Sequence, residues 1–289
     1  MVVGFLKYGA FETPQVGFQG KVVPWRIRME TEDKMPSISL GWRARIGLLY
    51  PETGLLDEEY WQFAPHGVAV FIGRTEVPGK ASVKVLTEMA ESSQVERMAK
   101  GLALVQLDSL AYACTAAGFV RGVGSDLELT SRLRALTGVP ATCTITAVVK
   151  ALRALGAKRI SVATPYIEEL DQRLHDFMVS SGFEILAQEG LGKHGIAINF
   201  VTPEEVYKLA RRVDRHDADA VFIACTGLRT VEVLDALEAD LGKPVVSANQ
   251  ATMWDALRIA GVDPYVEGVG RLFRSSSSHL SKGAQEVAL

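Results

Sequence analysis

The chain has 289 residues, of which 48% are hydrophobic and 22% charged, and its formal net charge is −3 at pH 7. This is the composition of a globular protein with room for one large or two small domains, and it offers no basic surface for nucleic acid. No apolar run reaches the roughly 18 residues of a membrane span, and the N-terminus lacks the basic-then-apolar order of a secretory signal. Three cysteines do not form a disulfide framework, so we expect a soluble cytoplasmic protein that has no membrane partner.

Short apolar strands and longer amphipathic helices alternate along the chain. Two strands that end at a proline are predicted at 45–51 and 159–165. Apolar residues at helical spacing over 86–102, and again over 206–213, predict helix faces. Thr202, followed by Pro, Glu and Glu, has the sequence of a helix start. Strand–helix alternation indicates βαβ units, and therefore parallel sheets covered by helices on both faces.

The order of landmarks in the middle of the chain occurs twice. The proline that ends each predicted strand, Pro51 or Pro165, is followed about 60 residues later by an Ala-Cys-Thr sequence, at Cys114 or Cys225. A helical segment, a Gly-x-Pro turn and another strand come next in both copies. The repeat predicts an α/β fold of two pseudo-symmetric domains, each a parallel sheet flanked by helices, with the active site in the cleft between them.

The repeat also predicts domain boundaries. We expect the first α/β domain over 43–145 and the second over 146–250. A return helix within 251–272 is expected to pack back onto the first domain. Residues 1–42 are interpreted as an N-terminal extension, and residues 273–289, which include four consecutive serines, as a flexible tail.

Cys114 and Cys225 each end an apolar run, and each is followed by Thr, a nearby Gly and a helical pattern. This context predicts a thiol at the carboxyl end of a strand, where the N-terminus of the next helix lowers its pKa and offers N–H donors to an anion. Two such thiols in matching halves suggest that they face one acidic substrate from opposite sides. The alternative is a buried structural cysteine, and we adopt that interpretation for Cys143, just before a predicted helix.

Residues beside the cysteines are candidates for substrate binding. Thr115 and Thr226 follow the cysteines directly, and their hydroxyl and N–H groups could bind a carboxylate or cap a helix. Gly227 permits the close approach of a ligand, and Tyr166, at a strand end, could donate a hydrogen bond to a carboxylate. The candidates are completed by Thr53, Gly54 and Thr164.

The histidines and glycines do not form a metal or nucleotide motif. None of the five histidines has a partner at ligand spacing such as i, i+4, although His194 lies in a predicted loop and could reach the cleft. Gly118, Gly122 and Gly124 do not follow a strand in the order of the dinucleotide fingerprint. We therefore expect no metal and no nucleotide cofactor. The paired thiols favour an acidic substrate, a small carboxylate or dicarboxylate, as the partner of the site. A homo-oligomer is a possible further assembly.

Three segments resemble the maleate isomerase and arylmalonate decarboxylase group of the aspartate/glutamate racemase superfamily, and most of all its ectoine-utilisation branch. They are Arg159–Tyr166 (RISVATPY), Phe222–Arg229 (FIACTGLR) and Pro244–Ala251 (PVVSANQA). The resemblance covers about 45–261. It implies a cofactor-independent enzyme of two similar α/β domains, whose paired cysteines act as acid and base or as nucleophile and proton donor.

By this resemblance Cys114 matches the cysteine of the first domain and Cys225 that of the second. The decarboxylase branch has a glycine at the first of these positions, so the presence of both cysteines implies an isomerase or a racemase. In an isomerase a thiolate adds to an activated double bond, which then rotates. In a racemase one thiolate removes the proton next to a carboxylate, and the other thiol returns a proton from the far side. The alternatives are a cofactor-independent decarboxylase of a malonate-type acid, with Cys225 as proton donor, and a non-catalytic carboxylate-binding protein.

The chain departs from the maleate isomerases in its loops. Those enzymes carry an Asn in the first loop to hold a substrate carboxylate, whereas residues 51–55 of this chain contain none. A second Asn is expected within 192–203, where Asn199 lies out of register. These departures argue against maleate as the substrate, and Leu55 and Leu56 would suit a substrate with a less polar end.

Overall fold

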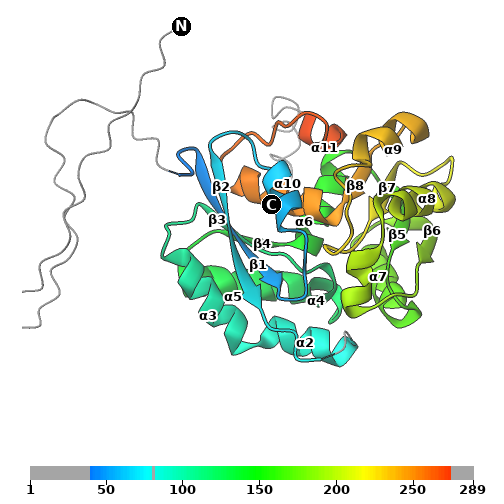
Figure 1. The fold of residues 1–289 in the computed structure, drawn as a ribbon. Coiled ribbons are helices and arrows are strands. Elements are labelled where there is room, and N and C mark those ends of the chain that lie inside the picture. The colour runs from blue at the N-terminus through cyan, green and yellow to red at the C-terminus, as the bar shows by residue number, and fades with distance from the viewer. Residues whose placement is uncertain (1–39, 80–81, 275–289) are drawn as a thin grey trace, which may run out of the picture. The chain divides into compact units, whose positions relative to one another are not determined.

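The computed structural model describes residues 40–79 and 82–274 (Figure 1). The described residues belong to one compact unit that begins at Ile38. The expectations for the N-terminal extension, as far as residue 39, and for the tail after Arg274 lie outside the described residues.

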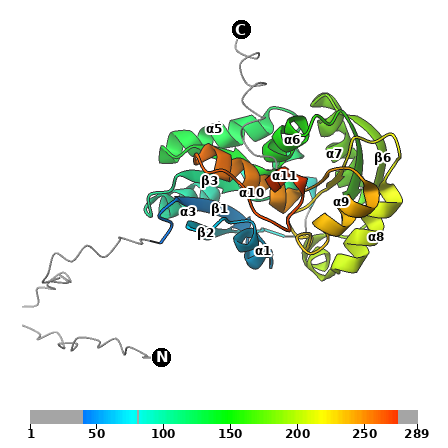
Figure 2. The same cartoon turned by 90° about the horizontal axis from the view of Figure 1, so that it is seen from above.

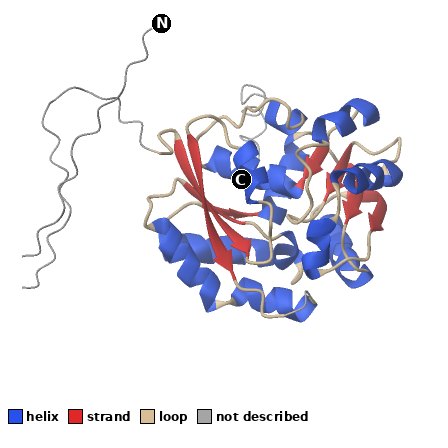
Figure 3. Cartoon of the chain, viewed as in Figure 1, coloured by secondary structure: helices blue, strands red, loops and turns tan. Residues whose placement is uncertain are grey.

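The strands of the described part form two four-stranded sheets, and every neighbouring pair is parallel. The first sheet contains β1 (Ala44–Pro51), β2 (Val68–Thr75), β3 (Ser109–Tyr112) and β4 (Ala141–Cys143), in the order β2-β1-β3-β4. The second contains β5 (Arg159–Thr164), β6 (Glu184–Gly190), β7 (Ala220–Ile223) and β8 (Val245–Ser247), in the order β6-β5-β7-β8. Figure 3 shows the sheets as two separate groups of arrows. The predicted α/β fold of two like parallel sheets is confirmed.

Helices connect successive strands and cover the sheets. In the first half they are α1 (Asp57–Gln62), α2 (Val83–Glu91), α3 (Ser93–Ala103), α4 (Thr115–Phe119) and α5 (Ser125–Thr137). α6 (Thr144–Ala154) leads to the second sheet, which is served by α7 (Glu168–Ser180), the 3₁₀ helix η1 (Gly195–Phe200), α8 (Pro203–Val213) and α9 (Leu234–Leu241). α10 (Ala248–Ile259) and α11 (Arg271–Arg274) follow the last strand. None of the described helices is long and apolar enough to cross a membrane.

Local sequence signals account for several element boundaries. α8 begins as predicted at the Thr202 cap, where the Thr202 hydroxyl and the Glu205 carboxylate form a capping box. The predicted helix face over 86–102 is wrong as a single helix. Ser92, in extended conformation, ends α2 and caps α3 by accepting a hydrogen bond from the N–H of Gln94 at 3.1 Å.

The inner strands, such as β7 (AVFI), are buried apolar runs because helices cover both faces of each sheet, whereas the edge strand β6 (EILAQEG) is only half-buried. α10 supplies part of this cover for the first sheet, although it follows the last strand of the second (Figure 2). The Ser109 hydroxyl of β3 donates to the carbonyl of Ala256 at 2.8 Å. The buried Asp255 carboxylate accepts from Thr142 at 2.6 Å and from Lys150 at 2.7 Å. α10 therefore ties the C-terminal part of the chain to the core of the first half.

Candidate active site

The carboxyl ends of β1, β3, β5 and β7 meet at a cavity of about 580 Å³. Parallel strands present their carboxyl ends at one edge of a sheet, where ligands of open α/β sheets bind. Cys114 follows β3 and Cys225 follows β7, and both line this one cavity. The structure thus brings together two thiols from equivalent places in the two sheets.

The cavity also gathers almost all of the other predicted site residues. Those that line it are Thr53, Gly54, Thr115, Tyr166, Thr226 and Gly227. Thr164 does not. Its buried hydroxyl donates to the Asp171 carboxylate and accepts the N–H of Tyr166 at 3.1 Å, so it holds the backbone of a lining residue. Cys143 also lies elsewhere, buried at the start of α6 with its sulfur 3.2 Å from the Thr146 hydroxyl.

Several lining residues were not singled out by the sequence. Tyr50 lies at the cavity, and its hydroxyl donates to the carbonyl of Thr226 at 3.0 Å, which joins the two halves. Asn199 lines the cavity despite its shifted register and donates to the carbonyl of Thr53 at 2.7 Å. The second Asn that the family resemblance leads us to expect within 192–203 was the sequence signal that could have identified it.

The cavity wall is largely apolar, but its apolar residues are not the expected ones. Leu55 and Leu56 do not line the cavity, and Leu55 is 59% exposed. That expectation is wrong because α1 begins directly after Leu56 and the chain turns away. The apolar lining comes from Val77, Leu86, Met89, Ala116, Leu170, Ile196, Ala197 and Ile198. Lys193 and His194 are also among the lining residues, so His194 reaches the cavity as the sequence suggested.

Cys114 is the N-cap residue of α4, as predicted, with extended backbone. The N–H groups of Ala116 and Ala117 lie near its sulfur and lower the pKa of the thiol. Burial has the larger effect and raises the pKa of Cys114 to about 12. The prediction that the helix N-terminus lowers the pKa of this thiol is therefore wrong, because desolvation outweighs the first turn of a five-residue helix.

Cys225 has a different backbone. Its φ of 84° lies in the left-handed region, which non-glycine residues seldom adopt. No helix starts beside it, because a turn follows and α9 begins only at Leu234, so this part of the prediction is wrong as well. The N–H of Gly227 donates to the Cys225 sulfur at 3.4 Å. Burial raises the pKa of Cys225, and hydrogen bonds from Gly227 and Tyr166 oppose that rise.

The polar groups of the cavity interact with one another. Ionised Cys225 raises the pKa of Cys114, which places the two thiols within electrostatic reach. The Tyr166 hydroxyl lies beside the Cys225 sulfur and the Thr115 hydroxyl. Among the described residues neither the Tyr166 nor the Thr115 hydroxyl has a well-formed hydrogen bond, although both are buried. Buried hydroxyls of this kind call for a partner, and a ligand oxygen in the cavity would supply one.

No group of three or more His, Cys, Asp or Glu side chains in the described part of the chain is placed to hold a metal ion. The arrangement instead offers two thiols, free hydroxyls and backbone N–H groups around a mainly apolar cavity. Such a site can bind an anionic group and move protons at a neighbouring carbon.

The chain is similar to several known proteins. A family model described as arylmalonate decarboxylase matches residues 65–273. Arylmalonate decarboxylase from Bordetella bronchiseptica is 36% identical over 166 residues, which are 56% of this chain and 69% of that protein.

Two solved structures are similar along most of their length. A variant of maleate isomerase from Pseudomonas putida S16 with maleate has a TM-score of 0.75 and 26% identity, covering 80% of this chain and 97% of its own. A cysteine-to-serine variant of the maleate cis-trans isomerase from Nocardia farcinica contains a covalently bound succinylcysteine intermediate. Its TM-score is 0.75 at 25% identity, covering 80% of this chain and 98% of its own.

Proposed function

This chain belongs to the arylmalonate decarboxylase family, and we propose that it is a cofactor-independent isomerase or racemase of a small carboxylic acid. The observation that carries the proposal is that Cys114 and Cys225, after equivalent strands of the two sheets, line one cavity. The named relatives are enzymes, and the succinylcysteine in the Nocardia structure supports a covalent role for a cysteine.

The substrate carboxylate binds next to the thiols. The Thr115 hydroxyl is buried without a well-formed hydrogen bond and donates to one of its oxygens, while the single proton of the neighbouring Tyr166 hydroxyl is directed at the Cys225 sulfur. Thr226 and Gly227 present backbone at the same place, and Thr53 and Gly54 approach from the first half. In this proposal Thr164 acts on the substrate only through Tyr166, because its own hydroxyl is bonded to Asp171.

The two thiols take different roles. Cys225 is the thiol that ionises more readily, because it is only half-buried, whereas Cys114 is buried, and because the Gly227 N–H and the Tyr166 hydroxyl stabilise its thiolate. Once Cys225 is ionised, its charge helps to keep the proton on Cys114. The pair therefore favours one thiolate and one thiol, which is the arrangement that an acid and a base require.

In racemisation the Cys225 thiolate takes the proton from the carbon next to the carboxylate, and the resulting carbanion takes the Cys114 proton on its other face. Cys225 ends as a thiol and Cys114 as a thiolate, so the reverse reaction can begin. In cis–trans isomerisation the thiolate forms a carbon–sulfur bond to one carbon of the double bond. The π electron pair of the double bond moves onto the other carbon and toward the carboxylate that this carbon bears. The central bond rotates, the carbon–sulfur bond breaks, and the double bond re-forms in the trans geometry.

A decarboxylase is the second candidate, and the apolar wall favours it. Residues such as Val77, Leu86 and Met89 suit a hydrocarbon substituent better than a second carboxylate. In this case Cys225 gives a proton to the carbon that has lost carbon dioxide. Cys114, which that reaction does not need, favours the isomerase or racemase.

Further predictions accompany the proposal. We expect a first domain at 43–145 with its return helix at 251–272, a second domain at 146–250, and a place in the ectoine-utilisation branch. The three free cysteines fit the reducing cytoplasm.

The decisive experiment incubates the protein in deuterated water with a panel of small acids and follows each by NMR. Deuterium uptake next to the carboxylate without net loss of substrate supports a racemase, and a cis–trans change supports an isomerase. Loss of carbon dioxide supports the decarboxylase. A Cys114/Cys225 double variant that keeps its turnover would overturn the thiol mechanism. Absence of turnover with every acid, while a dicarboxylate protects both thiols from alkylation, would instead support a binding protein.

A further inference from the structure

Glu59 is a buried carboxylate that the mechanism above does not use. It lies on α1 and is 4% exposed. One of its oxygens accepts from the N–H of Thr230 at 2.6 Å, from the Thr230 hydroxyl at 2.7 Å and from the N–H of Val231 at 2.6 Å. The other accepts from the side-chain amide of Asn249. A carboxylate of the first half is thus held by four donors that follow β7 and β8.

Four converging donors are the environment of an ionised carboxylate. Burial raises the pKa of Glu59, and the hydrogen bonds from Thr230, Val231 and Asn249 counteract that rise. If the carboxylate were removed, the N–H groups of Thr230 and Val231 would lose their acceptor. An unsatisfied buried donor destabilises the fold, because it has lost its hydrogen bonds to water without gaining another.

The segment that Glu59 holds begins at Cys225. The Tyr50 hydroxyl bonds the carbonyl of Thr226, and the Thr226 hydroxyl donates to the carbonyl of Ala113 at 3.2 Å. Glu59 fixes the far end of the same segment, at Thr230 and Val231. The left-handed backbone of Cys225 is strained, and such strain persists only where the surrounding structure holds it.

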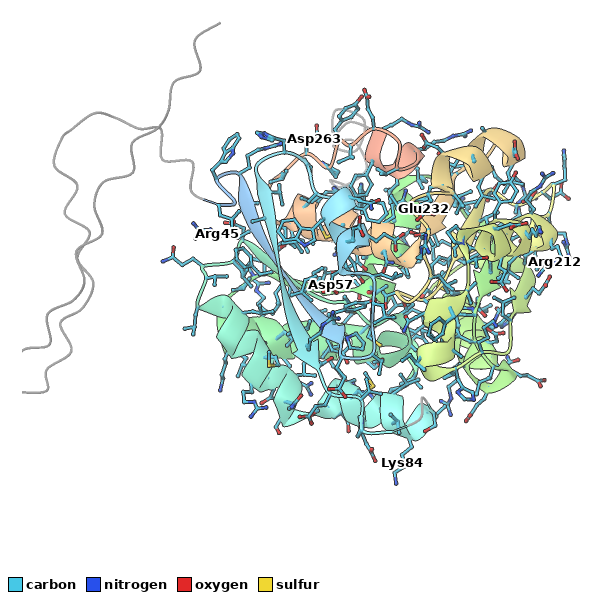
Figure 4. The ribbon with its side chains drawn as sticks, viewed as in Figure 1. Arg45, Asp57, Lys84, Arg212, Glu232 and Asp263 are labelled. Atoms are coloured by element: carbon cyan, nitrogen blue, oxygen red, sulfur yellow. The ribbon has the colours of Figure 1, made fainter. Side chains whose placement is uncertain are left out.

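α1 is itself fastened to the cavity wall, so it is a firm support for this segment. Tyr60, next to Glu59, packs edge-to-face on the ring of Tyr50 with centroids 5.4 Å apart. Asp57 of α1, labelled in Figure 4, accepts two hydrogen bonds of 2.8 Å from Arg74. The Arg74 guanidinium also lies over the Tyr50 ring, 5.1 Å from its centroid.

We propose that Glu59 is a positioning residue of the active site, which fixes the turn after Cys225 and so keeps the Cys225 sulfur aimed into the cavity. The proposal rests on the proposed function only in taking Cys225 as a catalytic group. A displacement of about 1 Å at a reacting group can cost about 100-fold in rate.

Glu59→Gln is the direct test, because it keeps the size of the side chain but puts an NH₂ group or a weaker acceptor against the donors. We expect kcat to fall about 100-fold while KM stays within about threefold, since the Tyr166 and Thr115 hydroxyls are unchanged. Glu238→Gln is the matched control. Glu238 is 2% exposed and likewise accepts from backbone N–H groups, at Val245 (3.0 Å) and Arg271 (2.7 Å), but it lies outside the cavity. Equal losses of kcat in the two variants would overturn the proposal.

A milder pair of variants covers the case in which Glu59→Gln does not fold. Thr230→Val removes one of the four donors, whereas Thr230→Ser keeps the hydroxyl. We expect kcat to fall about tenfold in the first and to stay within about twofold of wild type in the second. Equal kcat values in Thr230→Val and Thr230→Ser would contradict the positioning role of Glu59.

Alkylation of the individual cysteines by iodoacetamide, read by peptide mass spectrometry, needs no substrate. In Glu59→Gln we expect Cys225 to react about tenfold faster as its sulfur becomes less buried, and Cys114 to stay within about twofold. This readout separates the two proposals: if no acid is turned over, the proposed function fails while positioning is still tested. Equal changes at both cysteines, or none at Cys225, would overturn the positioning role.

Discussion

Cys114 and Cys225 follow equivalent strands, β3 and β7, yet the chain continues differently after each of them. Cys114 has extended backbone and caps α4, which begins at the next residue. Cys225 has a φ of 84° and is followed by a turn, with the next helix only at Leu234. The two sheets share one strand order, so the duplication is in the scaffold and not in the loops. Two thiols at equivalent positions can therefore differ in acidity, and an acid–base pair requires that difference.

Serine substitutions test the pair most severely. Cys225→Ser should lower kcat by more than about 10³-fold and Cys114→Ser by about 10²–10³-fold, because a hydroxyl is far less acidic than a thiol. Single-turnover assays on the acid identified by NMR would measure both. Cys143→Ser is the control and should keep most of the turnover, since Cys143 is buried away from the cavity. A Cys225→Ser variant with near-normal kcat would remove the distinction between the two sites.

The pH dependence of alkylation compares the two thiols directly. A raised pKa means that the thiol stays protonated at a given pH, so labelling must increase as the pH rises. With a pKa of about 12, roughly one Cys114 in 10⁴ is ionised at pH 8. We expect Cys225 to be labelled before Cys114, and both rates to keep rising about tenfold per unit between pH 7 and 9. A plateau below pH 8 at Cys114 would instead indicate a thiol activated by α4.

Glycine substitutions measure the backbone difference between the two loops. Cys225→Gly should be more stable than Cys225→Ala by about 1–2 kcal/mol, since glycine adopts a positive φ without strain. At Cys114 the order should be reversed, because its backbone is already extended and glycine gains only freedom in the unfolded chain. Urea unfolding of the four variants gives both differences. The same order of stabilities at both positions would refute the argument from strain.

The smallest expected effect concerns the hydrogen bond from the Tyr50 hydroxyl to Thr226, which joins the two halves of the chain. Tyr50→Phe removes the hydrogen bond to the carbonyl of Thr226 and should lower the free energy of unfolding by about 1 kcal/mol. Thr164, which precedes Pro165 as Tyr50 precedes Pro51, bonds only within its own half. Chemical denaturation of Tyr50→Phe and Thr164→Val compares the contributions of the two hydrogen bonds to the free energy of unfolding, and steady-state kinetics of the same variants compare their contributions to kcat. Unchanged kcat in Tyr50→Phe would show that the Thr226 backbone is held by other contacts.

The sequence predicted what depends on local pattern. The apolar runs of β1 and β5, the Thr202 cap and the position of both thiols after strands follow from hydrophobic period and turn chemistry. The conformation at Cys225 could not be predicted, because the same Cys-Thr pair occurs at Cys114 with a different φ. Nor could the raised thiol pKa, since burial depends on packing from distant segments.

The residues that the sequence missed are those whose partners lie far along the chain. Tyr50 bonds Thr226, 176 residues away, and Asn199 bonds Thr53, 146 residues away. Glu59 likewise meets its donors across the two halves. No periodicity or motif links such pairs, and of these residues only Asn199 had a sequence signal, the Asn that the family resemblance leads us to expect within 192–203.

The crossing of α10 back to the first sheet has a consequence for how the protein is synthesised. β3 and β4 emerge from the ribosome more than 100 residues before Asp255 and Ala256, which bond Thr142 and Ser109. During that interval the nascent first half lacks the part of its cover that α10 supplies, and the apolar surface beneath α10 is open to chaperones or to another chain. The first half therefore cannot finish folding by itself during translation, and a fragment that stops before α10 would be an aggregation-prone intermediate and not a miniature of the protein.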